Sequence, residues 1–201
     1  GNPTPKGTSQ DLVNAARKMY REMSKETGDF FDMMCDMELF DLETKPNKDM
    51  GGYCTDFYDY KVPFIFSNFN GTSGDVDVLT HEAGHAFQSY LTNKTNPHLV
   101  PDCSFPTMES CEIHSMSMEF FAHPWMESFF KEDAEKALKD AGLTADDLDL
   151  AGGDGSLALD DAALLALTAR LHVAGHHVDA FHNNLQVCGN GAQHLALLAL
   201  V

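Results

Sequence analysis

The sequence lacks any long hydrophobic run. None of its 201 residues belongs to an apolar stretch of about 18 residues, the length that a membrane-spanning helix requires. The first residues, Gly-Asn-Pro-Thr-Pro-Lys, also lack the basic start and apolar run of a secretory signal. From these absences we expect no membrane partner and a cytoplasmic location.

Basic residues are scarce. The chain has 13 Lys and Arg residues against 31 Asp and Glu residues, which leaves a net charge of -18. Such a charge repels phosphate backbones and anionic lipid surfaces. We therefore expect no nucleic-acid partner.

Cysteine is sparse and irregularly placed. The five cysteines are odd in number and none lies in a C-x-x-C pair. This pattern argues against both a disulfide framework and a cysteine zinc site. Internal repeats are also missing, which excludes solenoid architectures.

Aromatic residues and methionines are almost missing from the second part of the chain. Residues 131–201 contain only Phe181 among the 20 aromatics and none of the ten methionines. This part is rich in Ala and Leu, which favour helix, and its run Gly152–Gly155 is typical of a break between helices. We predict a core over residues 1–132 and a helical C-terminal region of uncertain origin over 133–201.

Hydrophobic spacing in the core predicts a mainly α fold with a small β-sheet. Ser9 is a candidate cap for the first helix, and residues 51–70 combine aromatic and β-branched residues with glycine and proline, as two or three short strands would. The last core helix is apolar on most sides and should be buried. The expected helices cover residues 10–26, 28–43, 74–92 and 107–130.

The pentapeptide His81-Glu82-Ala83-Gly84-His85 is the main chemical motif. A four-residue step places two histidines on one helix face, about 6 Å apart, where both imidazoles can bind one zinc ion. Glu82 then serves as the general base that takes a proton from a zinc-activated water. The alternative is a helix in which this short pattern occurs by chance.

A catalytic zinc site needs a third protein ligand, and the core helix offers Glu109, Glu112 and Glu119. A carboxylate buried in an apolar helix requires a metal, a cation or hydrogen-bond donors. Glu112 and Glu119 are seven residues apart and share one stripe of the helix. This geometry suits one ligand and one residue that orients a ligand.

Longer strings of residues extend the motif. They resemble the oligoendopeptidase F branch of the thimet oligopeptidase family, zinc peptidases with H-E-x-G-H and a downstream glutamate ligand. The resemblance covers roughly residues 10–132, and its most specific strings are 51–55, 63–72, 75–88 and 109–121.

The resemblance implies a zincin-like (gluzincin) catalytic core, with an active-site helix and a glutamate-bearing helix. By the family pattern, one zinc ion would be held by His81, His85 and Glu112. Glu119 would support a ligand histidine. Asp77 is a weaker candidate for that task, since a carboxylate is also favoured near a helix N-terminus for its charge alone.

The resemblance further implies a zinc endopeptidase that hydrolyses short unstructured peptides. The peptide would pair with a strand edge near Gly51, Gly52 and Tyr53. The two glycines would allow close backbone approach, although a simple tight turn explains them equally.

Two features depart from the family pattern. The family supplies histidine and tyrosine side chains beyond the ligand glutamate, but here no tyrosine follows Tyr90. His172 and His176 could donate to an oxyanion or bind a second metal, or could be ordinary exposed histidines. Two alternatives therefore stay open: a zinc-binding core with little or no turnover, and a helical interaction module with an incidental motif.

Overall fold

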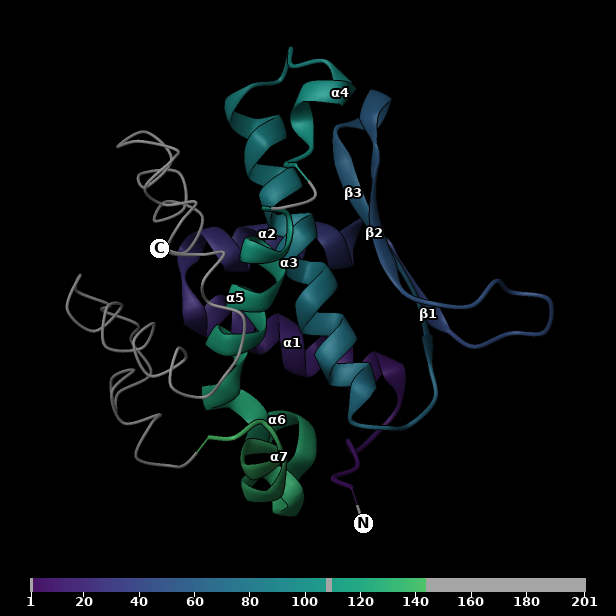
Figure 1. Ribbon diagram of the computed structural model, residues 1–201, viewed down its shortest axis with the longest axis vertical. Coiled ribbons are helices and arrows are strands. Elements are labelled where there is room, and N and C mark those ends of the chain that lie inside the picture. Colours follow the sequence, from purple (N-terminus) through teal and green to yellow (C-terminus); the bar gives the residue numbers. More distant parts are fainter. Residues whose placement is uncertain (1, 108–109, 144–201) are drawn as a thin grey trace.

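The computed structural model describes residues 2–107 and 110–143 (Figure 1). The expectation of a mainly helical fold with a small sheet is confirmed. Glu109, the run Gly152–Gly155, His172 and His176 lie outside the described residues. The elements are α1 (Ser9–Met23), α2 (Lys25–Asp36), β1 (Phe40–Glu43), β2 (Tyr53–Phe57), β3 (Val62–Phe69), α3 (Gly74–Thr95), α4 (Pro101–Ser104), α5 (Glu112–Ala122), α6 (Met126–Phe130) and α7 (Ala134–Asp140).

Helix α1 begins with a capping box rather than with the predicted Ser9 cap. The Thr8 hydroxyl accepts the Asp11 backbone N–H at 3.2 Å, and the Asp11 carboxylate accepts the Thr8 N–H at 2.7 Å. Two of the N–H groups that a helix start leaves unpaired are thereby satisfied. Ser9 is instead the first residue of the helix, so the prediction was one residue late.

The predicted helix over 28–43 is wrong beyond Asp36. Glu38 adopts a left-handed φ of 55°, and residues 40–43 form strand β1. The Leu39 carbonyl accepts the Ile65 N–H of β3 at 3.1 Å. Pairing with a distant strand thus overrides the local helical spacing.

The sheet has the order β1-β3-β2, with β1 parallel and β2 antiparallel to β3. Cys54 lies opposite Ile65. Since the N–H of Ile65 points towards β1, the backbone groups of Cys54 point away from β3. The outer edge of β2 is therefore free of strand pairing within the described residues.

Helix α3 lies between the sheet and α5 (Figure 1). The turn into it is fixed by the buried Asp75, whose carboxylate accepts the backbone N–H groups of Asn70 and Gly71 at 2.7 to 3.2 Å. Helices α1 and α2 supply much of the apolar core that α3 packs against. The largest fully buried side chains include Tyr20, Phe30, Phe31, Leu79, Met118, Phe129 and Phe130.

The predicted continuous helix over 107–130 is interrupted. Helix α5 ends at Ala122, and a 3₁₀ turn over His123–Trp125, which contains Pro124, precedes α6. Proline lacks the N–H that would continue the ladder of α5. The helix is also not buried on all sides, because Met116 is 39% exposed and the Glu112 side chain 50%. No helix among the described residues is long and apolar enough to cross a membrane.

Candidate metal centre

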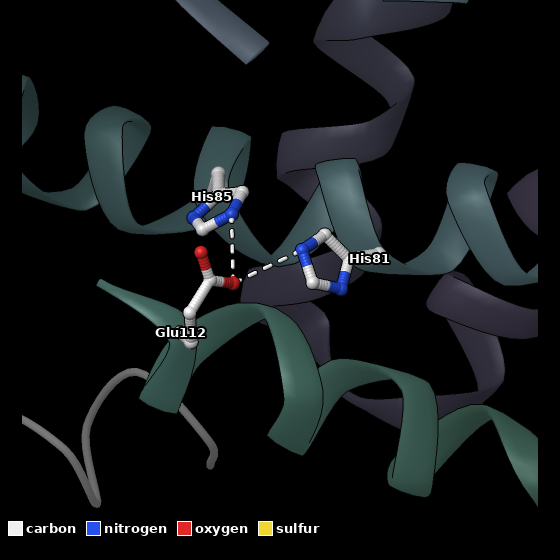
Figure 2. A group of neighbouring side chains, drawn as sticks. All are labelled: His81, His85 and Glu112. Atoms are coloured by element: carbon white, nitrogen blue, oxygen red, sulfur yellow. Dashed lines mark ion pairs between the residues drawn. The ribbon is translucent and has the colours of Figure 1, made fainter. Parts of the chain in front are cut away.

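Helix α3 presents two histidines on one side. His81 and His85 have ring centroids 5.0 Å apart, with an angle of 77° between the ring planes. Their Nε2 atoms point towards the same carboxylate of α5 (Figure 2). The four-residue step in a regular helix is sufficient to produce this pair.

Glu112, at the start of α5, completes the cluster. Its Oε2 atom lies 3.1 Å from His81 Nε2 and 3.4 Å from His85 Nε2. Ligand atoms that bind zinc tetrahedrally at about 2.0–2.1 Å lie roughly 3.3 Å from one another. The three ligand atoms, which all lie within 4.8 Å of one another, therefore fit a single zinc-sized ion.

Gly84 allows the two helices to approach closely enough for this arrangement. A Cβ atom on Gly84 would lie 2.5 Å from the backbone oxygen of His114 and 2.5 Å from Ser115 Cα. Only the absence of a side chain permits that separation. A glycine inside a helix is a recognisable signal of close packing, but its partner on α5 could not be read from the sequence.

Two hydrogen bonds orient the ligand side chains. His81 Nδ1 lies 2.5 Å from Glu119 Oε1, which leaves Nε2 of the same ring directed at the cluster. The buried Ser115 hydroxyl donates to Glu112 Oε2 at 2.7 Å. Asp77, the weaker candidate, makes no hydrogen bond to His81 in the part of the chain that the structure describes, and it is exposed.

The pKa values of the two histidines shift in opposite directions. Burial is the largest single influence on His81 and disfavours its charged form, but the hydrogen bond to Glu119 and the charges of Glu119, Glu82 and Glu112 together outweigh it and raise the pKa of His81 above 6.5. Burial lowers the pKa of His85, against the attraction of Glu112. Partial desolvation acts to raise the pKa of the half-exposed Glu112, but the hydrogen bond from Ser115 and the charges of both histidines lower it overall. A neutral His85 and a charged Glu112 are the forms that metal ligands require.

Glu82 lies between the histidines in sequence but faces the sheet. Its side chain is buried, and burial raises its pKa, while His81 and the backbone N–H of Cys54 act in the opposite direction. The hydrogen bond from Cys54 comes from the free edge of β2. The candidate base Glu82 therefore lies next to a strand edge that pairs with no other described strand. Its contact with Cys54 involves a backbone group, so no residue type in the sequence indicates it.

The residues Gly51, Gly52 and Tyr53 lead into β2. Gly51 has a φ of +98°, which favours glycine, and a Cβ atom on Gly52 would lie 3.0 Å from Val78 Cγ1 of α3. Tyr53 is 50% exposed and stacks on Phe66 with centroids 4.8 Å apart. The backbone therefore explains why glycine occupies both positions: Gly51 adopts a left-handed turn, and Gly52 approaches α3 closely.

Comparisons with known proteins agree on one family. Peptidase family M3 matches residues 18–144. The chromosomal oligoendopeptidase F of Lactococcus lactis subsp. cremoris is 34% identical over 67 residues, which cover 33% of this chain and 11% of that protein. A crystal structure from Bacillus anthracis str. Ames, provisionally named oligoendopeptidase F, is 60% identical, covers 68% of this chain and 24% of that one, and has a TM-score of 0.64.

A structure of PZ peptidase A with an inhibitor gives a TM-score of 0.65 at 58% identity, over 70% of this chain and 25% of that one. The chain thus spans about a quarter of the solved relatives and 11% of the curated one. The matched residues include the two histidines, Glu82 and Glu112. The chain belongs to peptidase family M3.

Proposed function

We propose that this chain carries the catalytic core of a zinc-dependent endopeptidase that hydrolyses peptide bonds in short unstructured oligopeptides. The observation that carries the proposal is the arrangement around Glu82. On one side lies the cluster of His81, His85 and Glu112, and on the other the free edge of β2. A cytoplasmic location remains part of this proposal.

The chemistry divides between an ion and the side chains around it. Zinc held by His81, His85 and Glu112 would act as a Lewis acid and lower the pKa of a water from about 15.7 towards 7. Glu82 accepts a proton from the attacking water and passes it to the nitrogen of the leaving amine. Burial, which raises the pKa of Glu82, suits both halves of that transfer because the proton is held and then released.

Substrate preference follows from the strand edge. A peptide that pairs with the backbone of β2 must be extended, because its own N–H and C=O groups have to meet the outward carbonyl of Cys54 and the outward backbone groups of Asp56. Folded segments already use these groups internally. An edge of five residues, Tyr53–Phe57, suits a short unstructured peptide.

A second function has a specific observation in its favour. The chain spans about a quarter of the solved relatives, and no tyrosine follows Tyr90 in it. A donor to the oxyanion contributes about 10²- to 10³-fold to the rate of acyl transfer. A core that binds zinc but turns over little or no substrate is therefore the alternative.

Metal analysis and one substitution test both proposals. The purified chain should contain one zinc ion and lose stability on chelation; a metal-free chain indifferent to chelator would refute both. A quenched fluorescent peptide should be cleaved by the wild type and by the exposed control Glu127→Gln, but not by Glu82→Gln, which should keep its zinc. Zinc binding without cleavage by the wild type would instead support the alternative.

A further inference from the structure

Strand β2 lies at the edge of the sheet and pairs with another strand on one side only. It pairs with β3, and under the proposed function, on which this inference rests, its outer edge must stay open for a peptide. β2 is an edge strand of only five residues, and its other support comes from α3, through the hydrogen bonds from the Cys54 N–H to Glu82 and from the Ser89 hydroxyl to Asp56. These contacts lie at Cys54 and Asp56, so the entry to the strand at Tyr53 depends on the loop over residues 44–52 that precedes it, which projects from the sheet in Figure 1.

The side chain of Lys48 points from this loop back to strands β1 and β3. Its side chain is only 6% exposed, and its Nζ atom donates to the carbonyl oxygens of Asp41 at 2.9 Å, Glu43 at 2.9 Å and Ser67 at 2.5 Å. The Asp41 carboxylate lies 3.1 Å away as counter-charge. A buried ammonium is costly unless it is paired in this way, so the contacts hold Lys48 in a single position.

The same ammonium reaches β2 through an aromatic side chain. Lys48 Nζ lies 4.4 Å from the centroid of the Phe66 ring, and Phe66 stacks on Tyr53, the first residue of β2. A cation near a ring and a stacked ring pair both restrict how that ring can move. Lys48 therefore connects β1, β3 and the start of β2.

Asn68 holds the end of the loop, between Lys48 and the start of β2. Its Nδ2 atom donates to the carbonyls of Asp49 at 2.8 Å and Gly51 at 3.0 Å. These bonds attach the loop to β3 where no strand pairing exists. Gly52 follows, lies close to Val78 of α3, and directly precedes Tyr53.

We propose that Lys48 and Asn68 are positioning residues for peptide binding. Together they fix the approach to β2, so that the outer edge of the strand stays aligned with Glu82 without a further strand on that side. Neither residue touches the metal cluster. Their loss should weaken the binding of a peptide and leave the chemical step largely intact.

The test compares Lys48→Met and Asn68→Asp with the wild type in the full chain. Lys45→Met is the matched control, because Lys45 also contacts Asp41, at 2.8 Å, but is 57% exposed. Amide hydrogen exchange should become about tenfold faster over Tyr53–Phe57 in both variants and stay unchanged in α1. With a quenched fluorescent peptide, KM should rise about tenfold while kcat changes less than twofold and zinc content stays the same.

The outcomes separate this inference from the proposed function. Unchanged exchange over Tyr53–Phe57, or faster exchange with unchanged KM, would overturn the positioning role even if the wild type cleaves peptides. If the wild type neither binds nor cleaves any peptide, the proposed function fails, and the exchange rates alone decide whether these residues hold the strand. If Lys48→Met accelerates exchange in α1 as well, the Asn68→Asp variant provides the test.

Discussion

Replacing Gly84 by alanine should separate the two helices that carry the metal ligands. The new Cβ atom would lie 2.5 Å from the His114 backbone oxygen and from Ser115 Cα, whereas ordinary contact begins at 3.4 Å. Both obstacles are backbone atoms, so no side-chain rotation can relieve the overlap. Helix α5 must withdraw by about 0.9 Å, and Glu112 moves with it.

The effect of Gly84→Ala on stability combines the cost of overpacking with the gain in helix propensity. Overpacking a well-packed interior costs about 1–3 kcal/mol, whereas alanine in place of glycine in a helix gains about 1 kcal/mol. We therefore expect Gly84→Ala to lower the free energy of unfolding by up to about 2 kcal/mol. Zinc sites tolerate errors in ligand distance of about 0.2 Å, so zinc affinity should fall at least tenfold.

The two effects are measured separately. Urea unfolding in the presence of chelator gives the stability of the metal-free chain, and competition with a chromogenic chelator gives zinc affinity. Gly74→Ala, at the start of the same helix, is the matched control because its Cβ atom would lie 3.5 Å from the nearest atom, the Thr72 hydroxyl oxygen. If Gly84→Ala matched Gly74→Ala in both measurements, the close approach of α3 and α5 would not govern the site.

Three further predictions follow from single contacts. Glu119→Gln removes the charge beside His81 and should lower zinc affinity about 10- to 100-fold, measured by chelator competition, with little change in metal-free stability. Asp75→Ala leaves backbone N–H groups of the β3–α3 turn without their charged acceptor and should cost about 2 kcal/mol in urea unfolding; a loss below about 0.5 kcal/mol would contradict that role. Burial lowers the pKa of His123, so the unfolded chain binds its proton more readily and stability falls as the pH drops below about 6.5. In His123→Gln the fall in unfolding free energy between pH 7.5 and 5.5 should be smaller than in the wild type, and an equal fall would assign it to other groups.

Local spacing determined much of the helical part of this protein. Helix α3 and the neighbouring positions of His81 and His85 follow from a four-residue step, which fixes the geometry of one helical turn whatever surrounds it. The small sheet between residues 51 and 70 followed from its aromatic and β-branched residues. The family strings singled out Glu112, but its distance from the histidines came only with the fold.

Tertiary structure decided the features that depend on two elements at once. Strand β1 replaced the end of a predicted helix because β3 offered it hydrogen bonds, and Pro124 ended α5 within a segment of continuous apolar pattern. The contact between Glu82 and the Cys54 N–H uses a backbone group, which every residue possesses, so no residue type announces it. The place of Glu112 depends on how closely α5 approaches α3, and that separation is set by packing at Gly84 rather than by the spacing of any motif.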